Sequence, residues 1–276
     1  MTPAGQPERP APRGRALAGG DSSRQSMKPV HRSFCPPHSR LSRRQFLIFG
    51  WIPFLRPRHI SLNGAHFRIL RNGHSKRRYL VIHGDEETAR AVLTRFIDTH
   101  DGIAYIIQSH TRNVPIEGGE IDPNRMFSRV GAGASLKSLN PAWTPQQLDA
   151  ALALLDRGRP HLVKALFPPR GGLLVALHNN SEQYSVADEQ PISDAVSLRE
   201  PSNPHAFFLC TDPSDFRTLA TSPYNVVLQQ KIQQTDDGSL SRLAAGSGVR
   251  YVNLEVRMGS SERQTEMLRW LDRNLP

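Results

Sequence analysis

The chain has 276 residues, of which 35 are Lys or Arg and 25 are Asp or Glu, so its formal net charge is +10. Residues 1–60 hold eleven of the basic and two of the acidic residues, which leaves 24 basic and 23 acidic residues in 61–276. Nucleic-acid backbones are bound by clustered cationic side chains, so a nearly neutral body argues against a nucleic-acid-binding domain. With only Cys35 and Cys210, a disulfide framework and a cysteine-based zinc site are both excluded.

Residues 1–60 are predicted to form a disordered basic leader, because residues 1–26 are rich in Pro, Gly, Arg and Ala and show no apolar period. From Met27, an alternative start, a basic stretch leads into Ser-Arg-Arg-Gln-Phe-Leu at 42–47 and an apolar run to Leu55. This segment, about 42–55, resembles a twin-arginine export signal and predicts a periplasmic or exported protein. The short apolar run and the lack of an A-x-A cleavage site leave a cytoplasmic protein with a basic tail and an edge strand as the alternative.

The body, residues 61–276, alternates short apolar runs with helical patterns. In chain order, the predicted elements are strands His66–Leu70 and Tyr79–Ile82, helix Glu86–Thr99, strand Ile103–Ile107, helix Gln146–Leu155, strands Leu173–Leu177, Ala206–Cys210 and Tyr251–Val256, and helix Ser261–Leu275. Strands separated by helices predict a single α/β domain with a mixed, mainly parallel central sheet and helices on both faces. No apolar run approaches the roughly 20 residues of a membrane-spanning helix.

Polar residues follow three of the predicted strands. His83 and Glu86 follow the strand that ends at Ile82, His178 follows the strand that ends at Leu177, and Glu255 lies in the last strand. Ligands of open α/β sheets bind at the carboxyl ends of strands, so these positions are candidate site residues. Two His and one Glu also supply the three protein ligands of a catalytic zinc, although His-x-x-Glu alone is more typical of a structural loop and helix start than of a metal site.

A longer ordered set of residues resembles the zinc carboxypeptidase family. The set is His83-x-x-Glu86, Arg112, the Asp-Pro-Asn-Arg segment at 122–125, Leu177-His178-Asn179 and Glu255, and it covers roughly residues 75–260. The family includes shorter members that trim peptidoglycan peptides or deacylate N-acyl amino acids. Pro123 and the Asn-Asn pair after His178 depart from the family's pattern, which leaves the substrate open.

The resemblance implies a role for each of seven residues: His83, Glu86 and His178 as ligands of one zinc ion, Arg112 as the partner of the scissile carbonyl, Asn124 and Arg125 as a clamp for the substrate carboxylate, and Glu255 as the general base. The chemistry agrees with these roles, because zinc lowers the pKa of a bound water to about 7 and a guanidinium binds a carboxylate through two parallel hydrogen bonds. The structural alternatives are a solvated loop arginine for Arg112, a turn cap for Asn124-Arg125, and a salt bridge to Arg250 or Arg257 for Glu255.

The function implied by the resemblance is zinc-dependent hydrolysis of an amide bond. A carboxypeptidase that acts on short, possibly cell-wall, peptides is the main hypothesis, and an N-acyl amino acid deacylase is its alternative; a non-catalytic binding protein on the same fold is a third. The expected partner is a peptide or N-acyl amino acid, with no nucleic acid and no membrane span, and the sequence does not specify an oligomeric state. Tyr224 matches the loop tyrosine of the family by position alone, and a core or surface tyrosine is the favoured interpretation; Cys210 is predicted to be a buried apolar residue rather than a nucleophile.

Overall fold

The computed structural model describes residues 58–231 and 236–276, so the predicted export motif lies outside the described residues. The strands are β1 Arg58–Leu62, β2 Ala65–Asn72, β3 Arg78–Val81, β4 Gly102–Ile107, β5 Val114–Ile116, β6 Gly119–Ile121, β7 Leu174–Asn180, β8 Ala195–Ser197, β9 Phe207–Cys210, β10 Asn225–Leu228 and β11 Tyr251–Arg257. The helices are α1 Glu87–Ile97, α2 Arg129–Leu139, α3 Pro145–Leu166, α4 Val186–Glu189, α5 Pro213–Leu219, α6 Leu240–Gly246 and α7 Ser261–Asn274, with short 3-10 helices η1 Pro123–Arg125 and η2 Gln190–Ile192.

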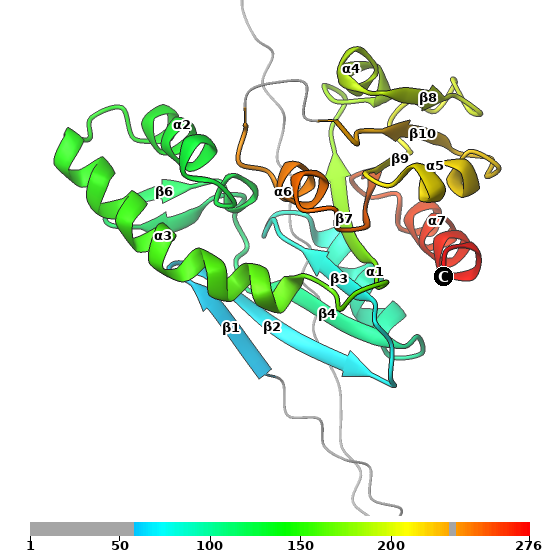
Figure 1. Cartoon of the computed structure of the whole chain (residues 1–276), viewed down its shortest axis with the longest axis horizontal. Coiled ribbons are helices and arrows are strands. Elements are labelled where there is room, and N and C mark those ends of the chain that lie inside the picture. Colours follow the sequence, from blue (N-terminus) through cyan, green and yellow to red (C-terminus); the bar gives the residue numbers. More distant parts are fainter. Residues whose placement is uncertain (1–57, 232–235) are drawn as a thin grey trace, which may run out of the picture. The chain divides into compact units, whose positions relative to one another are not determined.

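Nine strands form one mixed sheet in the order β1-β2-β4-β3-β7-β11-β9-β10-β8, and β5 and β6 form a separate hairpin (Figure 1). The central strands β4, β3, β7 and β11 are mutually parallel. The pairings place β1 and β8 in the same direction as these four, while β2, β9 and β10 run the opposite way. The predicted fold class, an α/β domain with a mixed, mainly parallel sheet, is confirmed.

Apolar side chains are buried on both faces of the sheet. One face packs against α2, α3 and α6 through residues such as Leu136, Leu155 and Leu240. The opposite face packs against α1, α5 and α7 through residues such as Leu93 and Leu268. Alternate residues of a strand point to opposite faces, so central strands covered on both sides must be apolar at nearly every covered position, as in β3 and in the first four residues of β7. None of the helices in the described residues has the length and apolar character needed to span a bilayer.

Two elements extend at least three residues beyond their predicted ends. Helix α3 continues past Leu155 to Leu166 with Pro160 in its interior, and strand β7 continues past Leu177 to Asn180. By sequence alone, the polar residues His178, Asn179 and Asn180 predict that the strand ends before them. Strand β11 pairs with β7 up to Asn180 and satisfies its backbone groups, so the strand persists. His178 therefore lies inside a strand, two residue pairs from its end, rather than in a loop after it.

Several elements have no clear sequence signal. Strand β1 begins at Arg58 and pairs with β2, so regular structure starts three residues before the predicted boundary at 61. The hairpin β5-β6 and helices α2, α4, α5 and α6 are also absent from the predicted set. They have at most 11 residues each, and short segments are stabilised mainly by the surfaces they pack on.

Candidate metal centre and active-site cavity

A cavity of about 770 Å³ opens at the carboxyl ends of the central parallel strands. The loop after β3 supplies His83 and Glu86, and the long connection after β4 supplies Arg112, Asn124 and Arg125. Strands β7 and β11 supply His178 and Glu255. All seven residues that the family resemblance selects therefore line one cavity, although they are spread over 173 positions of the chain.

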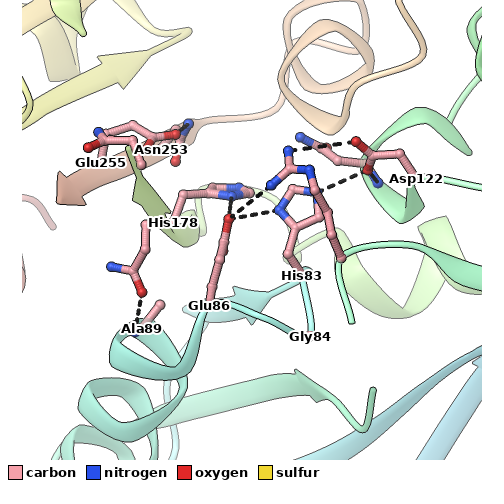
Figure 2. A network of polar contacts seen from close by, with 12 residues as sticks. His83, Gly84, Glu86, Ala89, Asp122, His178, Asn253 and Glu255 are labelled. Carbon is pink, nitrogen blue, oxygen red and sulfur yellow. Dashed lines mark hydrogen bonds and ion pairs between the residues drawn. The ribbon is translucent and has the colours of Figure 1, made fainter. Parts of the chain in front are cut away.

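His83, Glu86 and His178 converge on one point (Figure 2). The Nδ1 atom of His83 lies 2.8 Å from Glu86 Oε1, and the Nδ1 atom of His178 lies 3.2 Å from the same oxygen. One ligand atom from each residue lies within 4.8 Å of the other two, and all three residues are buried. This spacing is compatible with a metal site, since one ion can reach three such donors.

The second nitrogen of the His83 ring is also paired. His83 Nε2 lies 2.9 Å from Asp122 Oδ1, on the side of the ring away from Glu86 (Figure 2). Burial by itself would lower the pKa of His83, but the hydrogen bonds with Asp122 and Glu86 outweigh it and raise that pKa to about 9. A carboxylate behind a ligating histidine fixes the ring orientation and tautomer. Asp122 therefore belongs to the site as the residue that orients His83.

The donor set fits a divalent cation in a further respect. Burial by itself would raise the pKa of Glu86, but the charges of His178 and His83 and their hydrogen bonds lower it to about 2, so the side chain is a carboxylate. Its second oxygen, Oε2, is buried and has no hydrogen-bond partner among the described residues. A buried, unpaired carboxylate oxygen costs free energy unless a cation compensates it. Two imidazoles and a carboxylate are N and O donors of the kind zinc prefers.

The loop that carries His83 depends on a close backbone approach at Gly84. A Cβ atom at Gly84 would lie 2.4 Å from the carbonyl oxygen of Thr111, so only glycine fits. Arg90 of α1 adds a second tie: its guanidinium donates to the carbonyls of Gly84, Ile107 and Ser109 at 2.6–2.7 Å. The loops after β3 and β4 are therefore held together, which fixes the ligand loop relative to the segment that carries Arg112.

Glu255 lies on the other side of His178 from Glu86 (Figure 2). Its carboxylate accepts hydrogen bonds from Asn253 at 3.0 Å and Asn180 at 3.3 Å. Burial raises the pKa of Glu255, and the nearby Glu86 charge adds to the rise. A buried carboxylate with a raised pKa suits proton transfer near neutral pH.

The salt-bridge alternative for Glu255 is not seen. Arg250 pairs with Asp215 at 2.6 Å, and Arg257 pairs with Glu182. Neither arginine pairs with Glu255 in the described part of the chain, so its carboxylate is held by amides alone.

Arg112 is the most exposed of the seven residues, with 51% of its side chain accessible. Its guanidinium nitrogens lie 3.9 Å from Glu86 and 3.7 Å from Asp122, at the mouth of the donor cluster. Arg112 is therefore a solvent-exposed loop arginine, as the structural alternative expects, but its side chain points at the candidate metal site. Arg112 therefore lies beside the carboxylates of Glu86 and Asp122 and remains half exposed to solvent.

Asn124 and Arg125 form part of η1, which Asp122 caps. Asp122 Oδ1 accepts from the backbone N–H of Asn124 at 2.7 Å, so the segment is also the turn cap that was considered as an alternative. The side chain of Asn124 accepts from the backbone N–H of Leu240 at 3.2 Å and ties η1 to α6. Arg125 pairs with Asp237 at 3.2 Å, at a partly exposed site on the cavity wall.

Some residues of the site carried no clear sequence signal. Asp122 belongs to the matched segment, but only its contact with His83 reveals its role. Asn180, Asn253 and Arg242 line the cavity without matching any motif. Tyr224 packs against Phe208 and Trp270, away from the cavity lining, and Cys210 is fully buried; both are packed residues, as predicted.

No family model matches the chain, and no curated protein matches it. Similar solved structures include a succinylglutamate desuccinylase/aspartoacylase from Rhodobacter sphaeroides, with 16% identity over 75% of this chain and 57% of that one and a TM-score of 0.38. A protein from Shewanella baltica described as a metallopeptidase has 10% identity over 79% of this chain and 86% of that one, with a TM-score of 0.41. A protein from Shewanella amazonensis, described in the same way, has 11% identity over 79% of this chain and 84% of that one, with a TM-score of 0.38. At this level of similarity, function has to be argued from the site residues.

Proposed function

We propose that the protein is a zinc-dependent amide hydrolase. The observation that supports this most is that one cavity is lined by a buried His-Glu-His donor set, the buried carboxylate of Glu255, and several arginines that include Arg112 and Arg125. Those are the groups that amide hydrolysis needs: a site for a Lewis acid, a base, and cations for the carbonyl oxygen and for a substrate carboxylate.

Each residue of the site has its own role in the proposed hydrolysis. Glu255, with its raised pKa, takes a proton from the attacking water and returns it to the leaving amine. Arg112 stabilises the negative charge that develops on the carbonyl oxygen. Asn124 and Arg125 hold the substrate carboxylate, which places the scissile amide over the donor cluster. His83, Glu86 and His178 would hold the zinc ion, which would supply Lewis acidity when bound.

A short peptide with a free carboxyl terminus is the substrate we propose. The cavity volume of about 770 Å³ lies within the ordinary range for small-molecule sites, roughly 300–1,000 Å³. An N-acyl amino acid is the second candidate, because it carries the same amide and carboxylate on a molecule that fits this volume. A comparison of two catalytic efficiencies, one for an unblocked tripeptide and one for an N-acetyl amino acid, distinguishes these two substrate classes.

Export of the chain is a separate part of the proposal and rests on Arg43 and Arg44 in the segment 42–55. Export would give the enzyme access to cell-wall peptides. A fusion of residues 27–60 to a reporter should be exported, and the Arg43→Lys, Arg44→Lys double variant should stay in the cytoplasm. Cytoplasmic retention of the intact fusion would contradict export and leave the enzymatic proposal untouched.

The test of the enzymatic proposal is metal content followed by a substrate screen. The purified chain is expected to hold about one zinc per molecule and to release amino acids from short peptides or N-acyl amino acids. If the protein takes up no zinc from excess metal, the enzymatic proposal is wrong and a non-catalytic binding protein is the better interpretation.

A further inference from the structure

The cavity continues beyond Glu255 into a part whose residues the proposed reaction does not use. We call this part the distal arm, and it is lined by Tyr184, Glu189, Ile192, Leu209 and Gln229. In the sheet, β9 and β10 lie on the side of β11 away from β7, and α4, which ends at Glu189, packs on β10 (Figure 1). The distal arm is therefore free to take a part of the substrate that lies outside the scissile amide and the carboxylate clamp.

The carboxylate of Glu189 is held in the distal arm by neutral donors. Its Oε1 atom accepts a hydrogen bond from the Tyr184 hydroxyl at 2.5 Å, and its Oε2 atom accepts one from the side-chain amide of Gln229. The backbone carbonyl of Glu189 also accepts from the hydroxyl of Ser193 at 2.7 Å. Both the side chain and the backbone of Glu189 are therefore fixed, while its negative charge is left uncompensated by these contacts.

Glu189 differs from other carboxylates of the cavity wall because it has no cationic partner. Asp237 pairs with Arg125, and Glu182 pairs with Arg257. Within residues 58–231 and 236–276, no lysine, arginine or histidine pairs with Glu189. A carboxylate offers about four lone-pair positions, and two of those on Glu189 are occupied by Tyr184 and Gln229. An incoming cation can use the others without displacing a protein cation.

The amides beside Glu255 are also short of hydrogen-bond donors. Asn180 and Asn253 line the cavity, are 7% and 9% exposed, and donate their amide N–H groups to Glu255. Their Oδ1 atoms are buried and have no hydrogen-bond partner among the described residues. Buried acceptors are normally paired with a donor. This stretch of the cavity wall therefore carries more acceptors than donors.

The Tyr184 hydroxyl connects the two groups of acceptors. Burial raises the pKa of Tyr184, and the charges of Glu255 and Glu189 add to the rise. The hydroxyl therefore keeps its proton, which it donates to Glu189, and it lies within electrostatic reach of both carboxylates. The arm beyond Glu255 is negative and rich in acceptors, unlike the part of the cavity that holds Arg112 and Arg125.

We propose that Glu189 binds a primary ammonium group of the substrate in the distal arm. An ammonium group donates three hydrogen bonds and accepts none, which matches a wall rich in acceptors. Leu209 and Ile192 give the same arm apolar surface, along which the methylene groups of an aliphatic amine can pack. A lysine-like side chain and a free α-amino group both supply this ammonium. The inference rests on the proposed function for the position of the amide, but its test does not require turnover.

The test measures binding of two pairs of probes to the full chain by calorimetry, with and without zinc. Nα-acetyl-L-lysine and N-acetyl-L-norleucine differ in a side-chain amine, whereas L-alanyl-L-alanine and N-acetyl-L-alanyl-L-alanine differ in a free α-amine. The amine of at least one pair is expected to bind about tenfold more tightly than its neutral partner, as a charge-assisted pair implies. The pair that shows this preference identifies the source of the ammonium. In Glu189→Gln the preference should fall to within about threefold.

Glu182→Gln is the matched control, because it removes another carboxylate of the same cavity wall and should keep the tenfold preference. Equal affinities within both pairs in the wild-type protein would overturn the proposal whether or not the Glu189 variant folds, and so would a preference that survives in Glu189→Gln. A chain that prefers the amine but neither holds zinc nor cleaves amides would contradict the proposed function and leave Glu189 assigned. A chain that cleaves amides without this preference would contradict the assignment of Glu189 alone.

Discussion

Glu255 of β11 lies directly opposite His178 of β7 in the parallel pairing at the centre of the sheet. Opposed residues of neighbouring strands point to the same face, so the candidate base and a candidate metal ligand enter the cavity side by side. A shift of one residue in this pairing would turn one of them toward the core on the other face, next to Leu177 or Leu254. The register of two strands thus places the proposed base beside the metal site.

Glu255→Gln is expected to keep the metal and lose hydrolysis. The substitution preserves the size of the side chain but removes the proton acceptor, so the catalytic efficiency should fall by about 10²–10⁴-fold. Zinc content and thermal midpoint, measured on the same preparation, should match those of the wild-type protein. Wild-type activity in this variant would show that another group is the base.

His178→Ala is expected to abolish tight zinc binding, because it removes one of three protein donors. Metal content after dialysis should drop from about one zinc per chain to near zero, and hydrolysis should drop with it. His161→Ala is a suitable control, since His161 lies exposed on α3 and does not line the cavity. Full zinc occupancy in His178→Ala would remove His178 from the ligand set.

Asp122→Asn should weaken zinc binding by about 10–100-fold without abolishing it. An asparagine can still accept from His83 Nε2, but it does not supply the negative charge that strengthens the imidazole as a ligand. A competitive chelator titration measures the affinity. Glu120→Gln, which removes an exposed carboxylate two residues away, should leave the affinity unchanged, and an equal loss in both variants would point to a general electrostatic effect.

Asn179→Ala is expected to lower the free energy of unfolding by about 1–3 kcal/mol. The buried Asn179 side chain accepts from the N–H of Ala89 at 2.8 Å and donates to Gln264 at 3.2 Å, so it joins α1 and α7 beneath the site. Its removal leaves buried polar groups unpaired. Urea unfolding of the zinc-free protein measures the effect, and the exposed Gln183→Ala should change stability by less than about 0.5 kcal/mol. An equal change in both variants would contradict a bridging role.

Local patterns in the sequence were sufficient to predict much of the sheet and its class. Apolar runs around Tyr79, Ile103, Leu173 and Tyr251 are long and regular enough to specify β3, β4, β7 and β11, because a strand buried on both faces needs apolar residues at almost every position. The candidate site residues were also accessible from the sequence, since their order along the chain resembles a known family. Helix α6 could not be predicted in this way, because seven residues are too few to show a helical period.

The sequence by itself therefore determined the composition of the site: two histidines and a glutamate able to hold a metal, a buried carboxylate and a set of arginines. Only the tertiary structure decided which arginines already have a carboxylate partner and which carboxylate orients His83. Those relationships join residues that are not neighbours in the sequence: Asp237 lies 112 positions from Arg125, and Asp122 lies 39 positions from His83. Ion pairs and hydrogen bonds act over a few ångströms in space, and no local sequence pattern encodes such distances.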